Sequence, residues 1–542
     1  MDIYILIVII IFVAAYFIYG KFLEKVFSVS ENEPVPSKSF YDGVDFVPTN
    51  KFVLLGHHFS SIAGAGPIVG PIIAGIAFGW FGAILWIVIG TIFFGGVHDF
   101  VSLLVSVRHQ GKSVAEVINQ YVNKKTYKIF LIFVWLSLVY VVTVFADLAA
   151  ETFAKESSVA EINILYIVIA VVFGVLIYKF KLKLSWTTIF MLGLLVIGIY
   201  YSINHQFVLL DRRSWVWILL GYCVIASILP VWLLLQPRDY MSSFLLYASI
   251  IVGLVGLLFG KFKISYPSVV SFNSSGVGSL VPFLFITIAC GAISGFHSLV
   301  ASGTTSKQLD SMKNARFVAY GGMILEGIVA AISLATVILL TKTEKVASLS
   351  PAEIYSNGVS GFVSVLGLQP NVGKVFGYLI ISAFVLTTLD TATRIARYIL
   401  QEFLEIKKST NSSRILCTIT SLLLPILLLN VNIKDAAGKV IPAWKVVWPL
   451  FGTTNQLLAA MVLVVIYIWM YKNNIGKKNI VLLPAIFMLA MTFLALGKII
   501  LGNFVPRKVG VITVIGIILF LLALVLIWGM SGSIRKQNLE KS

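Results

Sequence analysis

The chain has 542 residues, of which 59% are hydrophobic and only 12% are charged, about half the charged share of an average soluble domain. Apolar runs of about 18 residues or more recur along it, each long enough to cross the hydrocarbon layer of a bilayer. The net charge of +18 does not indicate nucleic-acid binding, because the lysines and arginines lie in short segments between apolar runs. We therefore expect an all-α polytopic membrane protein, and exclude a soluble domain or a barrel of alternating ~10-residue strands.

The apolar runs predict fifteen membrane-spanning helices, the first of them an uncleaved helix rather than a signal peptide. They cover residues 3–20, 54–78, 83–105, 127–147, 163–179, 185–202, 215–235, 239–260, 281–299, 316–341, 374–396, 412–430, 447–471, 480–501 and 509–528. If segment 21–53 is cytoplasmic and the sides alternate, the cytoplasmic segments hold more lysine and arginine than the others. This bias predicts an extracellular N-terminus and a cytoplasmic C-terminus in a multi-pass protein of the cell membrane.

The second predicted span contains GHHFSSIAGAGPIVGPIIAG, residues 56–75. Backbone groups in a bilayer need partners, so glycine and proline at mid-span indicate an unwound segment that lines a cavity. We predict half-helices over 52–62 and 67–78, with 63–66 unwound, and expect the first N–H groups of the second half-helix to bind a substrate carboxylate. The predicted substrate-binding residues are Ala63, Gly64, Ala65, Gly66 and Pro67. The alternative is that these small residues only allow close helix packing.

A second interruption is predicted in span 215–235, where Pro230 lies inside the apolar run. This span is the fifth after the first interrupted one, a spacing that predicts an inverted five-plus-five repeat with discontinuous helices. Ser227 and Pro230 therefore join the predicted substrate site. The corresponding divisions are a first peripheral helix and loop, two repeats that form the transport core, and C-terminal peripheral helices: 1–53, 54–202, 215–396 and 412–542.

Ionisable residues inside predicted spans are costly in lipid and often mark a transport pathway. His57 and His58 lie near the cytoplasmic end of their span, and His98 and Asp99 lie in the cytoplasmic half of theirs. Histidine titrates near neutral pH, so we predict that these four residues couple transport to protons. The alternative is a structural role in hydrogen bonding between helices, and adjacent residues on a helix are not expected to face one site.

Five motifs, in order along the chain, resemble those of the carbon starvation protein A family. They are GHHFSSIAGAGPIVGPI (56–72), GGVHDF (95–100), SGFHSLVASGTTSKQL (294–309), TTLDTATRIARY (387–398) and WPLFGTTNQLLAA (448–460). The resemblance implies a secondary transporter of the inner membrane, similar in core fold to the amino acid–polyamine–cation superfamily. It also implies import of peptides or of pyruvate, driven by protons.

The resemblance extends to span 281–299, which is the eighth core helix of the proposed repeat. In that superfamily this helix supplies hydroxyls to a cation site, so the resemblance implies that Ser294 and Ser298 bind sodium or form the proton-coupled remnant of such a site. His297 lies on the neighbouring face and joins the predicted coupling residues. The alternative for the serines is hydrogen bonding between helices.

Two further carboxylates lie inside predicted spans. Asp390 is predicted to act in gating or coupling, or alternatively to pair with Arg394 four residues on. Glu326 has no local partner and is predicted to be a protonatable carboxylate. Outside the spans, Ser350 and Glu353 form a capping-box pattern with a proline at the first helical position, which predicts a short extracellular helix.

We predict a secondary active transporter, not an enzyme, that imports peptides or a small carboxylate such as pyruvate by proton-coupled alternating access and is linked to carbon starvation. The alternatives are a sodium-coupled symporter of the same fold and, in another class, a channel. The three cysteines have no paired spacing, and nucleophile–base, phosphate-loop and HExxH motifs are absent from the sequence. We therefore expect no cofactor and no bound metal, with substrate and lipid bilayer as partners and no nucleic acid.

Overall fold

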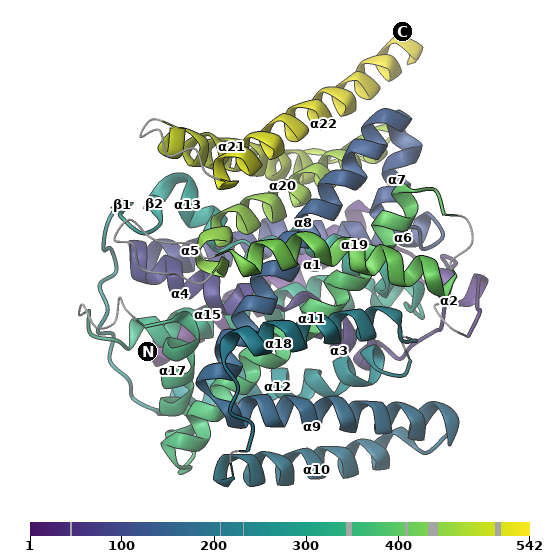
Figure 1. Ribbon diagram of the computed structural model, residues 1–542. Coiled ribbons are helices and arrows are strands. Elements are labelled where there is room, and N and C mark those ends of the chain that lie inside the picture. Colours follow the sequence, from purple (N-terminus) through teal and green to yellow (C-terminus); the bar gives the residue numbers. More distant parts are fainter. Residues whose placement is uncertain are drawn as a thin grey trace.

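The computed structural model describes residues 1–43, 46–205, 207–230, 232–342, 349–406, 410–431, 443–504 and 511–541. These residues form a bundle in which most of the long helices run roughly side by side (Figure 1). The sheet in the described chain is a hairpin of two-residue strands, β1 (Asn273–Ser274) and β2 (Gly278–Ser279). The predicted all-α class is therefore confirmed.

Twelve helices of the described chain are long and apolar enough to cross a membrane, or thirteen if the bent pair α3 (Lys51–Ile62) and α4 (Gly66–Phe78) is one span. The difference from the fifteen predicted spans lies in two elements. One is α11 (Arg212–Ile228), which has 17 residues, and the other is the pair α13 (Leu280–Thr287) and α14 (Gly295–Gly303). Length and composition thus establish a multi-pass membrane protein.

The remaining helices and shorter segments make up the rest of the bundle. The long ones are α1 (Asp2–Val26), α5 (Trp80–Ile89), α6 (Gly96–Arg108), α8 (Lys124–Lys155), α9 (Ser157–Gly174), α10 (Leu184–Asn204), α12 (Leu235–Phe259), α15 (Gly321–Ile338), α18 (Pro370–Phe403), α19 (Asn411–Asn430), α20 (Ala443–Lys472), α21 (Asn479–Phe504) and α22 (Val511–Lys541). Shorter segments are α2 (Pro36–Ser39), η1 (Gly90–Gly95), α7 (Val114–Tyr121), η2 (Val175–Lys179), η3 (Thr305–Lys307), η4 (Met312–Asn314), η5 (Arg316–Tyr320) and α17 (Pro351–Val365). α8 packs against α18 inside the bundle, whereas α10 and α22 lie at opposite sides (Figure 1).

α3 and α4 form the predicted discontinuous helix, with a bend of 47° between them. The side chain of Asn50 caps α3, and the helix ends where Ala63 leaves the helical region at φ −77° and ψ 82°. α4 restarts at Gly66, directly before Pro67, whose missing N–H costs nothing in a first turn. The predicted unwinding at 63–66 is confirmed to within one residue.

The second discontinuous helix is α13–α14, interrupted at residues 288–294, and not the predicted span 215–235. α11 ends at Ile228, and Leu229 is extended with ψ 148° because it precedes a proline. Pro230 therefore lies in the connection between α11 and α12, so the interruption predicted inside one span falls between two helices. A proline ends a helix in either case, and the sequence alone does not distinguish the two.

The two discontinuous helices touch at their breaks. A methyl group on Gly66 would overlap the side chain of Cys290, and one on Gly70 would overlap the backbone oxygen of Thr287. Glycine is required at Gly70 because the backbone of Thr287 leaves no room for a side chain, and at Gly66 because the side chain of Cys290 fills the space that a methyl group would need. Close helix packing, the alternative explanation of the glycines, thus applies together with unwinding.

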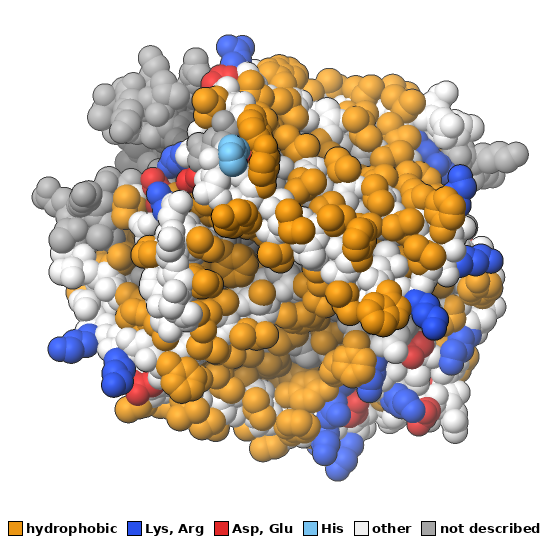
Figure 2. All heavy atoms as spheres, turned by 90° about the horizontal axis from the view of Figure 1, so that it is seen from below, with side chains coloured by type: hydrophobic (Ala, Val, Ile, Leu, Met, Phe, Trp, Pro, Cys, Tyr) orange, Lys and Arg blue, Asp and Glu red, His pale blue; other side chains and the backbone are white. Residues whose placement is uncertain are grey.

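The outer surface of the bundle is apolar. Figure 2 shows the face that α9 and α10 form, where hydrophobic side chains cover the middle and Lys and Arg side chains lie mainly toward the edges. On α10 the exposed side chains include Trp186, Ile189, Phe190, Val196, Ile197 and Tyr200. This is the surface expected of helices in contact with lipid.

α17 lies at the same end of the bundle as the N-terminus, opposite α2 and α7 (Figure 1). The predicted capping box is confirmed, since Glu353 N donates to Ser350 Oγ at 3.3 Å and Ser350 N donates to Glu353 Oε2 at 2.7 Å. Lys155, at the end of α8, lies 3.4 Å from the same carboxylate. Partial burial raises the pKa of Glu353, but the hydrogen bonds from Ser350 and the charge of Lys155 outweigh it and hold the pKa below its usual range.

We expect Ser350→Ala to destabilise α17 by about 1 kcal/mol, because the first N–H groups of the helix lose their cap. Hydrogen exchange of residues 351–365 in nanodiscs should become faster. The control is Ser364→Ala on the same helix, whose hydroxyl donates only to Ser360 O at 2.9 Å. The stabilisation from ionised Glu353 is complete above its unfolded pKa and is lost as the pH falls through the lowered native value, so the effect should shrink in acid. Equal exchange at neutral pH would contradict this role.

Candidate substrate and proton-coupling site

The breaks of the two discontinuous helices enclose a small cavity of about 10 Å³, roughly the room for one water molecule. Its lining residues are Ile62, Gly64, Val141, Phe145, Cys290, Phe296, Thr388 and Phe451. The hydroxyl of Thr388 is buried, has no hydrogen-bond partner among the described residues and lies beside Gly64. A buried hydroxyl without a partner is costly unless a ligand uses it. The predicted residue Gly64 thus lies at a site with an unused hydrogen-bonding group.

Asn455 of α20 holds the start of α14 in place. Its Oδ1 accepts a hydrogen bond from Phe296 N at 3.0 Å, and its Nδ2 donates to Ser294 Oγ at 3.0 Å. Ser294 is the residue before the helix, and Ser298 donates to Gly295 O at 2.7 Å. Both predicted coupling serines therefore have partners, and they belong to the second half of a discontinuous helix rather than to a continuous eighth helix.

Four ionisable side chains from α6, α14 and α15 form a continuous chain. Asp99 binds both histidines, with Oδ1 at 2.8 Å from His98 Nδ1 and Oδ2 at 2.8 Å from His297 Nδ1. The other ring nitrogen of His297 lies 3.2 Å from Glu326 Oε2. All four side chains have 0% exposure. The expectation that adjacent residues do not face one site is wrong for His98 and Asp99, which hydrogen bond to each other, although Asp99 also binds His297 of another helix. Glu326 likewise has a partner from another helix.

His58 lies close to this chain. Its Nδ1 is 2.9 Å from the hydroxyl of Thr305, its Nε2 has no hydrogen-bond partner among the described residues, and its ring faces Gly322, one turn before Glu326 on α15. The structure therefore brings together His58, His98, Asp99 and His297 among the predicted coupling residues, and adds Glu326.

His57 belongs to a second buried cluster, which is centred on Arg238. The Arg238 guanidinium binds both oxygens of Asp390, with Nη2 at 2.9 Å from Oδ1, and also donates to Asp239 Oδ1 at 3.0 Å. His57 Nδ1 lies 3.3 Å from the other oxygen of Asp239. Tyr222 OH donates to Asp390 at 2.8 Å. The cluster ties α3, α11, α12 and α18 together.

Arg394 is not the partner of Asp390. Its Nη2 donates to the backbone oxygens of Ala226 at 2.6 Å and of Leu229 at 2.5 Å, and Arg397 donates to Ser227 O at 2.6 Å. These two guanidinium groups satisfy the carbonyls that the end of α11 leaves free. Ser227 thus has a structural role at that end.

The predicted site residues Ser227 and Pro230 are not brought to the break of α3 and α4, because neither lines the cavity there. Arg238 was missed in the sequence, although it binds Asp390. The one available signal was its place in the first turn of an apolar helix, next to Asp239. Its partner lies 152 residues away, so only the folded structure identifies the pair.

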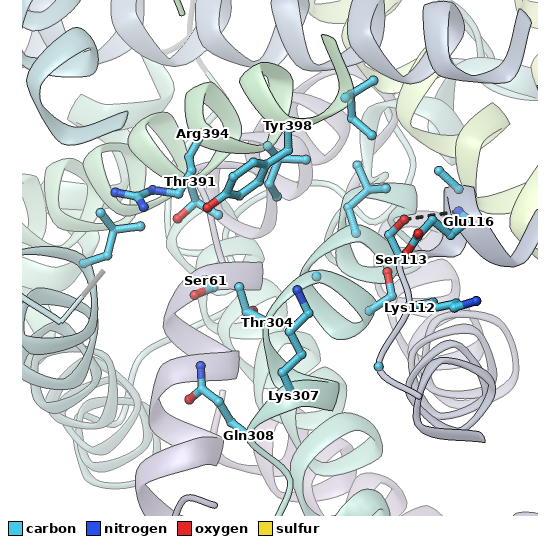
Figure 3. A pocket seen from close by; sticks show the side chains of 18 of the residues that line it. Ser61, Lys112, Ser113, Glu116, Thr304, Lys307, Gln308, Thr391, Arg394 and Tyr398 are labelled. Atoms are coloured by element: carbon cyan, nitrogen blue, oxygen red, sulfur yellow. Dashed lines mark hydrogen bonds between the residues drawn. The ribbon is translucent and has the colours of Figure 1, made fainter. Parts of the chain in front are cut away.

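A larger cavity of about 430 Å³ lies between α3, α7, α12, α14 and α18 (Figure 3). His57 and Ser61 of α3 line it, as do Lys307 of η3 and Thr391 of α18. α3 borders both cavities, since His57 and Ser61 line the larger one and Ile62, the last residue of the helix, lines the central one.

The sequence profile of the family described as carbon starvation protein CstA matches residues 2–357 and 342–495. Among similar proteins, the peptide transporter CstA of Helicobacter pylori strain J99 is 32% identical over 554 residues, covering 89% of this chain and 80% of that protein. The peptide transporter CstA of Escherichia coli is 30% identical, covering 90% of this chain and 79% of that protein. The pyruvate/proton symporter BtsT of Escherichia coli is also 30% identical, covering 90% and 80%.

Among solved structures, a crystal structure of the Eremococcus coleocola manganese transporter has a TM-score of 0.52, with 12% identity, covering 92% of this chain and 99% of that one. This likeness concerns the fold alone. These curated relatives and this structural neighbour are named transporters, not enzymes. The chain is a multi-pass membrane protein, which in bacteria places it in the plasma membrane, and it belongs to the carbon starvation protein CstA family.

Proposed function

We propose that this protein is a proton-coupled secondary transporter that imports a short peptide or a small carboxylate such as pyruvate by alternating access. The observation that carries the proposal is the position of α14. Phe296 of this half-helix lines the central cavity, and the next residue, His297, joins Asp99 to Glu326. One short element therefore contacts both the candidate substrate site and the buried titratable chain.

We further propose an inverted five-plus-five repeat with revised boundaries. The first repeat would consist of α3–α4, α5–α6, α8, α9 and α12, and the second of α13–α14, α15, α18, α19 and α20, with α10–α11 inserted in the first. Each repeat begins with a discontinuous helix, and each carries one short helix, α7 or α17, between its second and third members. With an extracellular N-terminus, α17 is extracellular and α7 cytoplasmic, at opposite ends of the bundle (Figure 1). The repeats would cover 51–259 and 280–472.

The coupling step uses the cost of buried charge. The two carboxylates and two imidazoles are not exposed to water, so an unpaired charge among them is costly. The gain or loss of one proton therefore changes which of the ion pairs between them stabilise the protein. Protonation of Glu326 weakens its attraction to His297, and deprotonation of His297 weakens its hold on Asp99. Either change alters the packing of α14 against α6 and α15, and thereby the shape of the cavity at Phe296. Proton movement and substrate binding are coupled in this way.

The substrate carboxylate is proposed to lie beside Gly64 and the hydroxyl of Thr388, close to the start of α4, in a conformation in which this cavity is wider than the space for one water molecule. The relatives are named for peptides and, in one case, for pyruvate with protons. Sodium coupling stays the alternative: Ser298 Oγ only donates, to Gly295 O at 2.7 Å, and keeps its lone pairs, whereas Ser294 Oγ also accepts a hydrogen bond from Asn455 Nδ2. We propose the link to carbon starvation from the description of the family alone.

Uptake by proteoliposomes tests the proposed function directly. We expect labelled dialanine or pyruvate to accumulate when the outside is acidic, and a protonophore to abolish the accumulation while sodium has no effect. Accumulation that requires sodium would favour the symporter alternative. Flux that equilibrates without accumulation would indicate a channel.

Glu326→Gln should abolish gradient-driven accumulation, because an amide neither gains nor releases a proton, while substrate exchange across the membrane should persist. Ser333→Ala is the control: this buried residue lies on the same helix, and its hydroxyl donates only to Val329 O at 2.8 Å. Normal accumulation by the Glu326 variant would rule out its coupling role.

Thr388→Val should raise the KM about tenfold, the loss expected for one hydrogen bond to a charged group. Folding should be unaffected, because this hydroxyl has no partner among the described residues. The matched control is Thr387→Val, whose hydroxyl donates to Ala383 O at 2.8 Å and does not line the cavity. An unchanged KM in Thr388→Val would remove this residue from the substrate site.

A further inference from the structure

The larger cavity has the size of a ligand site. Its volume of about 430 Å³ lies within the usual range for small-molecule pockets. It is bordered by α7 and the segment after α14, which lie at the proposed cytoplasmic end (Figure 3). The central cavity, by comparison, holds no more than a water molecule. A solute that leaves the centre toward the cytoplasm along α3 would enter the larger cavity.

Uncompensated charges of both signs line this cavity. Lys112, Lys307 and Arg394 border it together with Glu116, and none of the four has an ion-pair partner among the residues that the structure describes. The Lys307 amine lies 5.5 Å from the centre of the Phe46 ring, and Figure 3 shows it directed into the cavity. Glu402 of α18 adds a second carboxylate, which accepts a hydrogen bond from Tyr127. The ammonium group of Lys307 in η3 and the carboxylates of Glu116 in α7 and Glu402 in α18 therefore come from three different elements.

Buried polar groups without partners also border this cavity. The Thr391 hydroxyl has no hydrogen-bond partner in the described chain, although the residue is only 6% exposed. His57 is equally buried, and its Nε2 has no partner among the described residues. Buried polar groups in a folded protein nearly always find a partner, so these two groups are available to hydrogen bond with a polar ligand or with water.

We propose that this cavity is a second, cytoplasmic-side binding site for a short zwitterionic peptide. The peptide carboxylate pairs with Lys307, and its ammonium group pairs with Glu116 and Glu402. Thr391 supplies a further hydrogen bond. A lone carboxylate such as pyruvate would satisfy Lys307 but would not supply the ammonium group that Glu116 and Glu402 can bind. The inference rests on the proposed import function, and it narrows the substrate class from carboxylates in general to peptides.

Cysteine protection in purified full-length protein tests this site without transport. Cys223, Cys290 and Cys417 are buried, so Thr304→Cys at the cavity wall provides a selective target for a maleimide. We expect dialanine to slow the labelling. In that background, Glu116→Gln should raise the half-protecting dialanine concentration about tenfold, the loss of one charge-assisted hydrogen bond. Its effect on N-acetyl-dialanine should be small, because that compound carries no ammonium group.

Lys307→Met should weaken protection by both compounds. The control is Lys313→Met, since Lys313 is exposed and already paired with Glu31. Thr388→Val should leave protection intact, which separates this site from the central one. If dialanine gives no protection, or if neither Lys307→Met nor Glu116→Gln changes it, the second site is overturned. If protection follows the expected pattern but proteoliposomes accumulate nothing, the transport proposal fails while the binding site stands.

Discussion

Lipid offers no hydrogen bonds, so every backbone group freed by a break in a membrane helix needs a partner inside the protein. Two such breaks, after Ile62 and after Thr287, lie against each other in this structure. The surrounding bundle keeps lipid away from them: α8, α18 and α20 line the cavity between the breaks, and Asn455 accepts a hydrogen bond from Phe296 N in the first turn of α14. The interior can therefore hold polar groups that would be too costly in contact with lipid, and the candidate sites lie there.

The two buried charge clusters differ in the chemistry available to them. The guanidinium of Arg238 stays protonated at any physiological pH, so its bidentate pair with Asp390 is a fixed connection between α12 and α18. Histidine titrates near neutral pH, so the chain from His98 to Glu326 can change its charge. We assign the Arg238 cluster to holding the bundle together and the chain from His98 to Glu326 to coupling, because this chain includes His297 of α14, the half-helix that lines the central cavity.

The parts that local sequence determines were predictable. The cluster of glycine and proline from Gly64 to Pro67 is a local signal for a break, and the capping box at Ser350 is a local pattern. The second break was not predictable in the same way, because residues 288–294 contain no proline and a single glycine is compatible with a helix. The partners of Asp390 and Glu326 come from other helices, so the sequence marked both carboxylates as unusual without identifying what binds them.

The central claim is that substrate binding at the breaks changes the protonation of the chain formed by Asp99, His297 and Glu326. Proton exchange on substrate binding, followed with a pH indicator in weakly buffered detergent solution, measures this coupling without any membrane gradient. The account predicts a measurable proton uptake or release when wild-type protein binds substrate, and its loss in His297→Gln protein that still binds. Binding without proton exchange in the wild type, or equal exchange in the variant, would contradict it.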